Sequence, residues 1–422
     1  MAAAAAAAAV LSVALAVSFP QSSAAFTEEQ QLFLEAWRDV NQSYVDGKFN
    51  GRNWYQARQK LLAKPLESRE DTYARIRELL ALLDDRFTRL LTPAQYSNLV
   101  ASSQGDVVGV GVELDYGGEG KRVSDGFRVV SPAEGGPAAR AGVKPGDVLL
   151  AVDGVKAGDM GDLNEVAVRL RGAVGEKVAL SIRPSSGGPE REVQLTREKI
   201  QLKPVYSESC GPPAEPSVPS VGYLRVSAFS EKTEEAVREA LKALIDSDGA
   251  SALVLDLRNN AGGRFPAGIA VANMFLDSGG DTVITYITDA YGDKDLYQAE
   301  GDTLAGAKIP MAVLVNKGTA SAAEVLAGAL RDNRRATIVG EPTYGKGLIQ
   351  TVFKLSDGSG LVVTVAKYQT PGRNDINGVG ITPTSVRNVD DPQQMPPLDP
   401  QAVCAALKDT DYKLFAKSSK AL

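Results

Sequence analysis

A serine in a turn is the first candidate for chemistry. Residues 316–324 read N-K-G-T-A-S-A-A-E, and the patterns around them place Ser321 where a strand gives way to a helix. A hydroxyl on such a turn is exposed beside helix N–H groups that lack a helical partner, and those groups can stabilise an oxyanion. Ser321-x-x-Glu324 is also a capping-box pattern, so a structural role stays open at this point.

A lysine between glycines is the second candidate. Residues 340–347 read G-E-P-T-Y-G-K-G, which nearly spells the phosphate loop GxxxxGK[ST], but Gly347 stands where the magnesium-binding hydroxyl belongs. Residues 348–352 then read as a strand instead of the helix whose N-terminus would face the phosphates. We therefore exclude nucleotide binding and retain Lys346, whose glycine neighbours let it lie close to another backbone.

A third candidate is the run L-D-L-R-N-N-A-G-G over residues 255–263, which begins in an expected strand and continues past its C-terminal end. Ligands bind at this end of the strands in open α/β sheets. Gly262 and Gly263 can expose N–H groups there, whereas Asp256 and Arg258 share one face of the strand. A purely structural Asp256–Arg258 ion pair is the alternative.

The composition limits the base that could serve Ser321. The 422 residues contain no histidine, which rules out a Ser-His-Asp triad, an HExxH zinc site and a histidine-ligated haem. A carboxylate, lysine, tyrosine or thiol must serve, and Lys346 fits that role. Its pKa, ordinarily about 10.4, must be lowered by burial or by a nearby cation. A serine–lysine hydrolase of this kind needs no metal and no cofactor.

Charge and cysteine content narrow the possibilities further. The chain has 46 Lys+Arg against 52 Asp+Glu, a net charge of −6, which argues against a nucleic-acid partner. Cys210 and Cys404 are too few for a four-cysteine metal cage, and both one disulfide and two free thiols stay open. The hydrophobic content of 44% and charged content of 23% are ordinary for a globular protein of several domains.

The first residues are typical of a leader. No charge precedes Glu28, and the alanines from Ala2 to Ala9 lead into an apolar run followed by small residues that suit a cleavage site. The basic segment that usually starts such a signal is missing. A membrane anchor is the alternative, although the run is near the lower length limit for a span. We predict an exported protein with residues 1–25 as its targeting leader.

Three further regions are expected to position the candidate residues. Residues 26–104 have helical periodicity and predict a small helical domain. Residues 105–200 change to short strands with glycines. Residues 201–422 begin with a Pro/Ser/Gly-rich linker and then alternate strand and helix, which predicts a catalytic domain with a central, mostly parallel sheet. The fold class is therefore α/β, multidomain.

Residues 105–200 resemble a PDZ domain. The resemblance rests on A-G-V-K-P-G-D-V-L-L and on the glycine-rich residues 108–114 before it, which we expect to form one strand. It implies that backbone N–H groups in the loop and strand of Gly109, Val110, Gly111 and Val112 hold the C-terminal carboxylate of a peptide. A bulge or tight turn made by these glycines is the structural alternative.

Four motifs, in this order, resemble those of the carboxyl-terminal processing peptidases, a family of PDZ-containing serine proteases. They are G-Y-L-R-V-S-A-F, L-D-L-R-N-N-A-G-G, N-K-G-T-A-S-A-A-E and G-K-G-L-I-Q-T. The resemblance implies that Ser321 is the nucleophile and Lys346 its general base. It also implies an oxyanion hole formed by the N–H groups of Ala322 and of Gly262 or Gly263.

The same resemblance implies roles for further positions. Three match family residues that support the site, namely Asp256, Arg258 and Glu324. Gln350 matches a residue that orients the lysine; on a straight strand it would lie roughly 13 Å from Lys346, so contact requires a bend at Gly347. One departure is Arg86, where the family often has proline, in a segment far from the chemistry in sequence.

Within the family, L-F-L-E-A-W-R-D-V-N-Q-S-Y-V-D and K-Y-Q-T-P-G-R-N-D-I-N resemble the photosynthetic branch. That branch implies the thylakoid lumen as location and the C-terminal tail of the photosystem II D1 precursor as substrate. We expect a monomer and leave open a peripheral contact with the thylakoid membrane. The alternatives are a general exported tail-specific protease, as in a periplasm, and a non-catalytic PDZ scaffold. A resting form gated by the PDZ domain is a further hypothesis.

Overall fold

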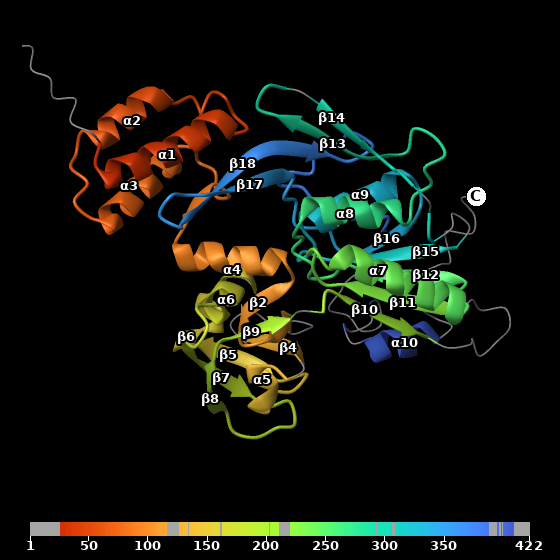
Figure 1. Cartoon of the computed structure of the whole chain (residues 1–422). Coiled ribbons are helices and arrows are strands. Elements are labelled where there is room, and N and C mark those ends of the chain that lie inside the picture. The colour runs from red at the N-terminus through yellow and green to blue at the C-terminus, as the bar shows by residue number, and fades with distance from the viewer. Residues whose placement is uncertain are drawn as a thin grey trace, which may run out of the picture.

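The structure is a computed structural model of residues 26–408, in which residues 116–125, 134, 161–162, 202, 211–219, 293, 302, 306–308, 388–394, 396–397 and 399 are not described. The predicted leader, residues 1–25, lies outside the described part. Within that part, no helix is both long and apolar enough to cross a bilayer. The elements form a helical region, a β-rich region and an α/β region (Figure 1).

The helical region, residues 28–103, begins with α1 (Glu28–Ser43), α2 (Trp54–Leu62) and α3 (Arg69–Ala81). The hydroxyl of Thr27 caps α1 by accepting from the N–H of Gln30, whose side chain accepts from the N–H of Thr27. The buried face of α1 shows the helical spacing expected from the sequence, with Leu32, Phe33, Ala36 and Val40.

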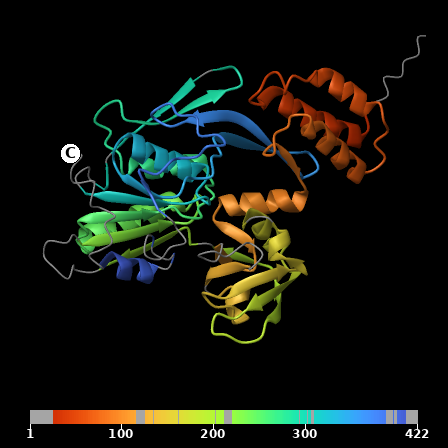
Figure 2. The same ribbon diagram turned by 180° about the vertical axis from the view of Figure 1, so that it is seen from behind.

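The core of the helical region extends into the α/β region. β1 (Arg89–Leu91) pairs antiparallel with β18 (Gly360–Gln369), and Leu361 and Val363 of β18 are buried among the helix residues. α4 (Pro93–Ser103) then leads toward the β-rich region (Figure 2). The helical domain expected over residues 26–104 therefore shares its core with β18 of the α/β region, whereas the core of the β-rich region is a separate cluster.

The β-rich region, residues 106–201, contains a sheet in the order β3-β4-β5-β7-β8, with β6 paired to β5. Its elements are β3 (Val112–Asp115), β4 (Phe127–Pro132), α5 (Pro137–Arg140), β5 (Val148–Val152), β6 (Val155–Lys156), α6 (Leu163–Leu170), β7 (Lys177–Arg183) and β8 (Arg191–Thr196). A separate antiparallel pair, β2 (Asp106–Gly109) and β9 (Glu198–Gln201), connects this sheet to its neighbours in the chain.

The single strand predicted over residues 108–114 is in fact two strands, so that prediction was wrong. β2 ends at Gly109 and β3 begins at Val112. Between them Gly111 has a φ of +71°, and a Cβ there would lie 2.9 Å from Cδ1 of Ile200. The glycine lets the chain leave β9 and pair with β4, which an uninterrupted strand could not do. β3 therefore lies at a sheet edge, where a peptide strand can add.

The α/β region, residues 205–408, contains a sheet that is parallel except for its edge strand β10. Its strands, in spatial order, are β10 (Val205–Ser209), β11 (Val221–Val226), β12 (Ala252–Asp256), β15 (Met311–Val315), β16 (Thr337–Gly340) and β19 (Ser385–Val386). β11, β12 and β15 are buried at every residue, as expected for strands covered on both faces.

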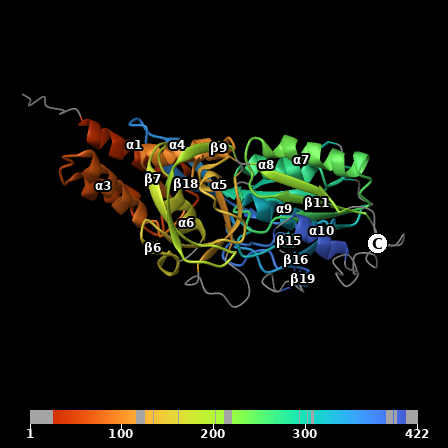
Figure 3. The same cartoon turned by 90° about the horizontal axis from the view of Figure 1, so that it is seen from below.

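Helices cover the two faces of this sheet unequally. One face packs against α7 (Thr233–Lys242) with its π-helical extension Ala243–Ser247, α8 (Phe265–Asn273) and α9 (Ala322–Asp332). The opposite face is covered in part by α10 (Pro400–Lys408) (Figure 3). The carboxyl ends of β12 and β15 place Gly262, Gly263 and Ser321 at the same edge of the sheet.

A second, antiparallel sheet joins the helical region to this edge. It contains β1, β18, β13 (Val283–Asp289) and β14 (Lys294–Gln298) in that order, and β17 (Leu348–Lys354) also pairs with β18. β18 contacts the helices through Leu361, whereas the hydroxyl of Tyr368 near its other end lies 3.3 Å from the carbonyl oxygen of Ser321. One strand thus reaches from the helical region to the nucleophile.

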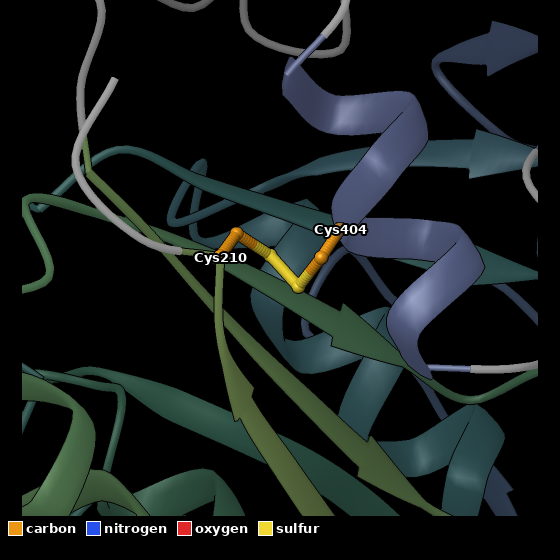
Figure 4. The surroundings of a disulfide bond; sticks show 2 residues. All are labelled: Cys210 and Cys404. Carbon is orange, nitrogen blue, oxygen red and sulfur yellow. A yellow bond between two sulfur atoms is a disulfide. The ribbon is translucent and has the colours of Figure 1, made fainter. Parts of the chain in front are cut away.

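The two cysteines form a disulfide, which settles the pairing that the sequence left open. Cys210 follows β10 and Cys404 lies in α10, with their Cα atoms 4.8 Å apart across a sequence separation of 194 residues (Figure 4). Both are buried against the sheet face that carries Val254 and Leu314. The bond therefore fixes α10 on that face.

Replacing both cysteines with serine is expected to lower the free energy of unfolding by about 2–5 kcal/mol, because the bond closes a long loop in the unfolded chain. Urea denaturation of the oxidised protein and the double variant would measure the difference. Dithiothreitol should shift the wild-type midpoint toward that of the variant and leave the variant unchanged. Equal midpoints for oxidised wild type and variant would contradict this role.

Candidate active site

Ser321 lies in the turn between β15 and α9, as the sequence predicted. Its φ of 57° and ψ of −120° fall in a region that residues other than glycine rarely occupy. The residues that cap α1 and α4 have ordinary extended backbones instead, with φ of −65° at Thr27 and −63° at Thr92. Glu324 accepts from the N–H of Ser321, as in the capping box that was the structural alternative, but a strained serine at the start of a helix is also the arrangement of an exposed nucleophile, which favours the catalytic interpretation.

The carboxylate of Glu324 connects the serine turn to the lysine loop. Its side chain is fully buried, and its Oε2 accepts hydrogen bonds from the N–H groups of both Ser321 (2.8 Å) and Lys346 (3.0 Å). Its Oε1 accepts from the N–H of Gly345 (2.6 Å) and from the hydroxyl of Thr343 (2.6 Å). One carboxylate therefore fixes the backbones of the candidate nucleophile and base relative to each other.

Lys346 has the electrostatic surroundings that a general base needs. Burial and the positive charge of Arg89 lower the pKa of Lys346 from 10.5 to about 8, against the opposing effects of Glu324 and Asp85. A substantial fraction of the amine is therefore neutral near pH 8. No hydrogen bond joins the side chains of Ser321 and Lys346 among the described residues, so the proton-transfer contact is not made in this structure.

The segment around Arg86 is close to the lysine, although it is far from it in sequence. Nζ of Lys346 lies 5.4 Å from the centroid of the Phe87 ring, and the guanidinium of Arg86 lies over the rings of Phe87 (4.8 Å) and Tyr344 (5.4 Å). The sequence did not indicate this contact, because no local pattern in residues 84–89 reports on a partner so distant in the chain.

The glycines after β12 lie against the serine turn. A Cβ on Gly262 would be 2.7 Å from Cβ of Ser321, and one on Gly263 would be 2.1 Å from the carbonyl oxygen of Phe229. Gly262 donates its N–H to Oδ1 of Asn260 (2.8 Å). The N–H groups of Gly263 and Ala322 have no acceptor among the described residues. Of the two predicted combinations, Ala322 with Gly263 is therefore the pair available to an oxyanion.

Asp256 and Arg258 form the buried ion pair that was the structural alternative. Nε of Arg258 donates to both carboxylate oxygens of Asp256 at 3.0 Å, and the hydroxyl of Tyr223 donates to Oδ2 at 2.9 Å. Burial alone would raise the pKa of Asp256, but Arg258 and Arg225 hold it below its usual range. The pair fixes the start of the glycine turn.

Asparagine and threonine side chains that the sequence did not single out hold the two turns together. Oδ1 of Asn316 accepts from the N–H of Asn259 (2.9 Å), and the hydroxyl of Thr319 donates to the carbonyl of Leu257 (2.8 Å). The carbonyl of Asn260 accepts from the N–H of Ala320 (2.9 Å). Asparagine and threonine cluster in the sequence where these two strands end, and this clustering was the signal from which their role in holding the turns could have been predicted.

Gln350 is not placed beside the lysine in this structure. A register shift lies between Ile349 and Gln350 in β17, and Gly347 has a φ of +56°, so the expected bend is present. The amide of Gln350 makes a long contact of 3.5 Å with the hydroxyl of Thr364, and no hydrogen bond to Lys346 is found within the described part of the chain.

The predicted carboxylate-binding residues run from Gly109, the last residue of β2, through the turn of Val110 and Gly111 to Val112, the first residue of β3. Their backbone oxygens are engaged, since those of Val110 and Gly111 accept from the N–H groups of Ala138 (3.0 Å) and Ala133 (2.9 Å). The N–H groups of Val110 and Gly111 have no acceptor among the residues that the structure describes. Two free donors beside an edge strand suit a terminal carboxylate.

Glu113 of β3 reaches the α/β region. Its carboxylate is paired with the guanidinium of Arg225 in β11, and Asp256 adds to the negative surroundings that raise the pKa of that arginine despite its burial. Arg225 is buried, and it lies beside Asp256 in the pairing of β11 with β12. Through Glu113, the edge of the β-rich sheet therefore contacts Arg225, the strand neighbour of the Asp256–Arg258 pair.

Comparison with known proteins places this arrangement among peptidases. Residues 220–387 match peptidase family S41, and residues 128–184 match a PDZ domain. A chloroplastic carboxyl-terminal-processing peptidase 2 of Arabidopsis thaliana is 45% identical over 402 residues, which cover 95% of this chain and 76% of the relative.

Other relatives agree with this. A chloroplastic C-terminal processing peptidase of Tetradesmus obliquus is 45% identical over 401 residues, covering 93% of this chain and 83% of that protein. A solved structure of a photosystem II D1 C-terminal processing protease superimposes with a TM-score of 0.67 at 41% identity, covering 92% of this chain and all of that chain.

Proposed function

Because this chain belongs to the carboxyl-terminal processing peptidases of family S41, we propose that it cleaves protein tails with a Ser321–Lys346 dyad. The observation that carries the proposal is the buried Glu324 carboxylate, whose Oε2 accepts from the N–H groups of both residues. One carboxylate oxygen thus holds the backbones of the proposed nucleophile and base next to each other. The lowered pKa of Lys346 supports the same assignment.

The chemistry is acyl transfer. Neutral Lys346 takes the proton of the Ser321 hydroxyl as its oxygen attacks the scissile carbonyl carbon. The N–H groups of Ala322 and Gly263 would stabilise the oxyanion, and protonated Lys346 returns the proton to the leaving amine. Lys346 then deprotonates a water that hydrolyses the acyl-enzyme. The Asp256–Arg258 pair supports the turn that carries Gly263.

The substrate class follows from the β-rich region. The N–H groups of Val110 and Gly111, with Gly109 and Val112 on either side, would hold the free carboxylate of a tail that adds as a strand to β3. The likeness to a solved D1 processing protease favours the D1 precursor tail. Chloroplastic relatives support a chloroplast location, and the exported-type leader favours the thylakoid lumen within it. In this proposal the protein acts as a monomer.

We further propose that the resting protein needs a rearrangement before chemistry. Ser321 and Lys346 are not hydrogen bonded, and β3 is tied to Arg225 through Glu113. A tail that adds to β3 would disturb that ion pair, next to the residues beneath the glycine turn. Binding of the tail and completion of the site would then be coupled.

Cleavage of synthetic peptides tests the proposal. A D1-type C-terminal peptide is expected to give one pair of products by mass spectrometry, with no effect of a chelator. The same peptide with a C-terminal amide should have a kcat/KM at least about tenfold lower, since the amide cannot form the charged contacts of a carboxylate. Binding without products would favour a PDZ scaffold, and equal cleavage of unrelated tails a general tail protease.

A further inference from the structure

The loop of residues 84–89, here called the cover loop, is held in a defined shape. Oδ1 of Asp85 accepts from the N–H of Phe87 (2.9 Å), and its Oδ2 accepts from the hydroxyl of Thr88 (2.6 Å). The same hydroxyl accepts from the N–H of Thr364 in β18 (3.0 Å). Pairing of Arg89 with Val362 continues this attachment. The cover loop is therefore attached to β18 through Thr88 and Arg89.

The cover loop faces the amine of Lys346. The Phe87 ring lies 5.4 Å from Nζ, and Arg86 spans the gap to Tyr344, two residues before the lysine. The charged groups that act on the amine are Arg89 and Asp85 from the cover loop and Glu324 from α9. The surroundings of the base are thus supplied by two regions of the chain that are far apart in sequence.

We propose that the cover loop is part of the active site, with Phe87 and Arg89 as positioning residues that seat the Lys346 amine and set the charge around it. The proposal rests on the assignment of Lys346 as the general base and extends it, since it gives the helical region a direct role in the reaction. Neither residue contacts the substrate carbonyl in this scheme. Both act through the lysine.

Arg89 and Phe87 have opposite effects on the protonation of the Lys346 amine. The positive charge of Arg89 disfavours a second positive charge nearby and so favours the neutral amine. The face of the Phe87 ring attracts an ammonium, although the ring also keeps water from the amine.

Arg89→Met is expected to raise the pKa of Lys346. Because activity requires the neutral amine, the acidic limb of the kcat/KM profile should move to higher pH by about half a unit, a loss of about threefold below the midpoint. Above about pH 9.5, activity should match that of wild type. Arg89→Lys should keep the wild-type profile, and Arg52→Met, which removes an exposed arginine elsewhere in the helical region, serves as a control.

Several outcomes decide the matter. An equal loss at every pH would assign Arg89 a structural role and overturn the proposal, as would an unchanged profile. The pH midpoint for acetylation of Lys346 by acetic anhydride, measured by mass spectrometry in a Ser321→Ala background, should shift in the same direction without any need for activity. If Lys346→Met still cleaves peptide, the dyad itself fails. If it does not cleave and Arg89→Met has no effect on either readout, only the role of the cover loop fails.

Discussion

Replacing Ser321 with alanine, or Lys346 with methionine, is expected to lower kcat/KM for a tail peptide by at least about 10³-fold. The serine variant lacks the proposed nucleophile, and the lysine variant lacks the amine proposed to take its proton. The double variant should be no worse than either single variant, because the two side chains act as a unit. Wild-type activity in either folded variant would exclude the dyad.

A stability measurement shows whether Lys346→Met is folded, and this substitution is expected to stabilise the protein instead of destabilising it. The pKa of Lys346 is about 8 in the folded protein and 10.5 in the reference state, so the folded protein disfavours the protonated amine. This penalty is fully present below about pH 8. Between about pH 8 and 10.5 the unfolded chain binds the extra proton, so wild-type stability should rise with pH.

Lys346→Met removes that ionisation. The variant is therefore expected to be more stable than wild type near pH 7, by at most about 3 kcal/mol, and the difference should shrink toward pH 10.5. Urea denaturation at both pH values measures it. A variant that is inactive yet more stable cannot owe its inactivity to unfolding.

Glu324→Gln is expected to damage both activity and stability. An amide places an NH₂ group against N–H or O–H donors where a carboxylate oxygen now accepts, and at least one pair of donors loses its acceptor inside a buried site. We expect kcat/KM to fall by about 10²-fold or more and the free energy of unfolding to fall by about 3–5 kcal/mol.

The matched control for this change is Glu192→Gln, an exposed glutamate on β8. Glu192→Gln should change the free energy of unfolding by no more than about 0.5 kcal/mol and kcat/KM by no more than about twofold. Wild-type kcat/KM in Glu324→Gln would show that the carboxylate is not needed to hold the nucleophile and base. A loss of stability with normal activity would reduce Glu324 to a structural residue.

Local patterns were sufficient to place several parts of the site. The strand and the helix expected on either side of Ser321 correspond to β15 and α9, so the position of Ser321 between them followed from hydrophobic periodicity. The same holds for Asp256 at the end of β12. Gly262 and Gly263 were predicted to expose N–H groups, and the structure adds that the backbone there has no room for a Cβ.

Contacts between distant segments could not be predicted in this way. Thr88 meets Thr364 across 276 residues, and the pairing of β1 with β18 has no signature in either strand alone. For that reason the contact of the cover loop with Lys346 could not be predicted from the sequence. The interruption at Gly111 was missed for a similar cause, since alternation of valine and glycine continues through it while the pairing partner changes.

β18 also has a consequence for the order in which the protein is made. The helices near the start of the chain bury Leu361 and Val363, so their core stays incomplete until the ribosome has added those residues. The same strand places Tyr368 against the serine turn. A nascent chain that lacks β18 has neither a finished helical core nor a seated base. Synthesis from the N-terminus thus keeps the peptidase incomplete until β18 has been made.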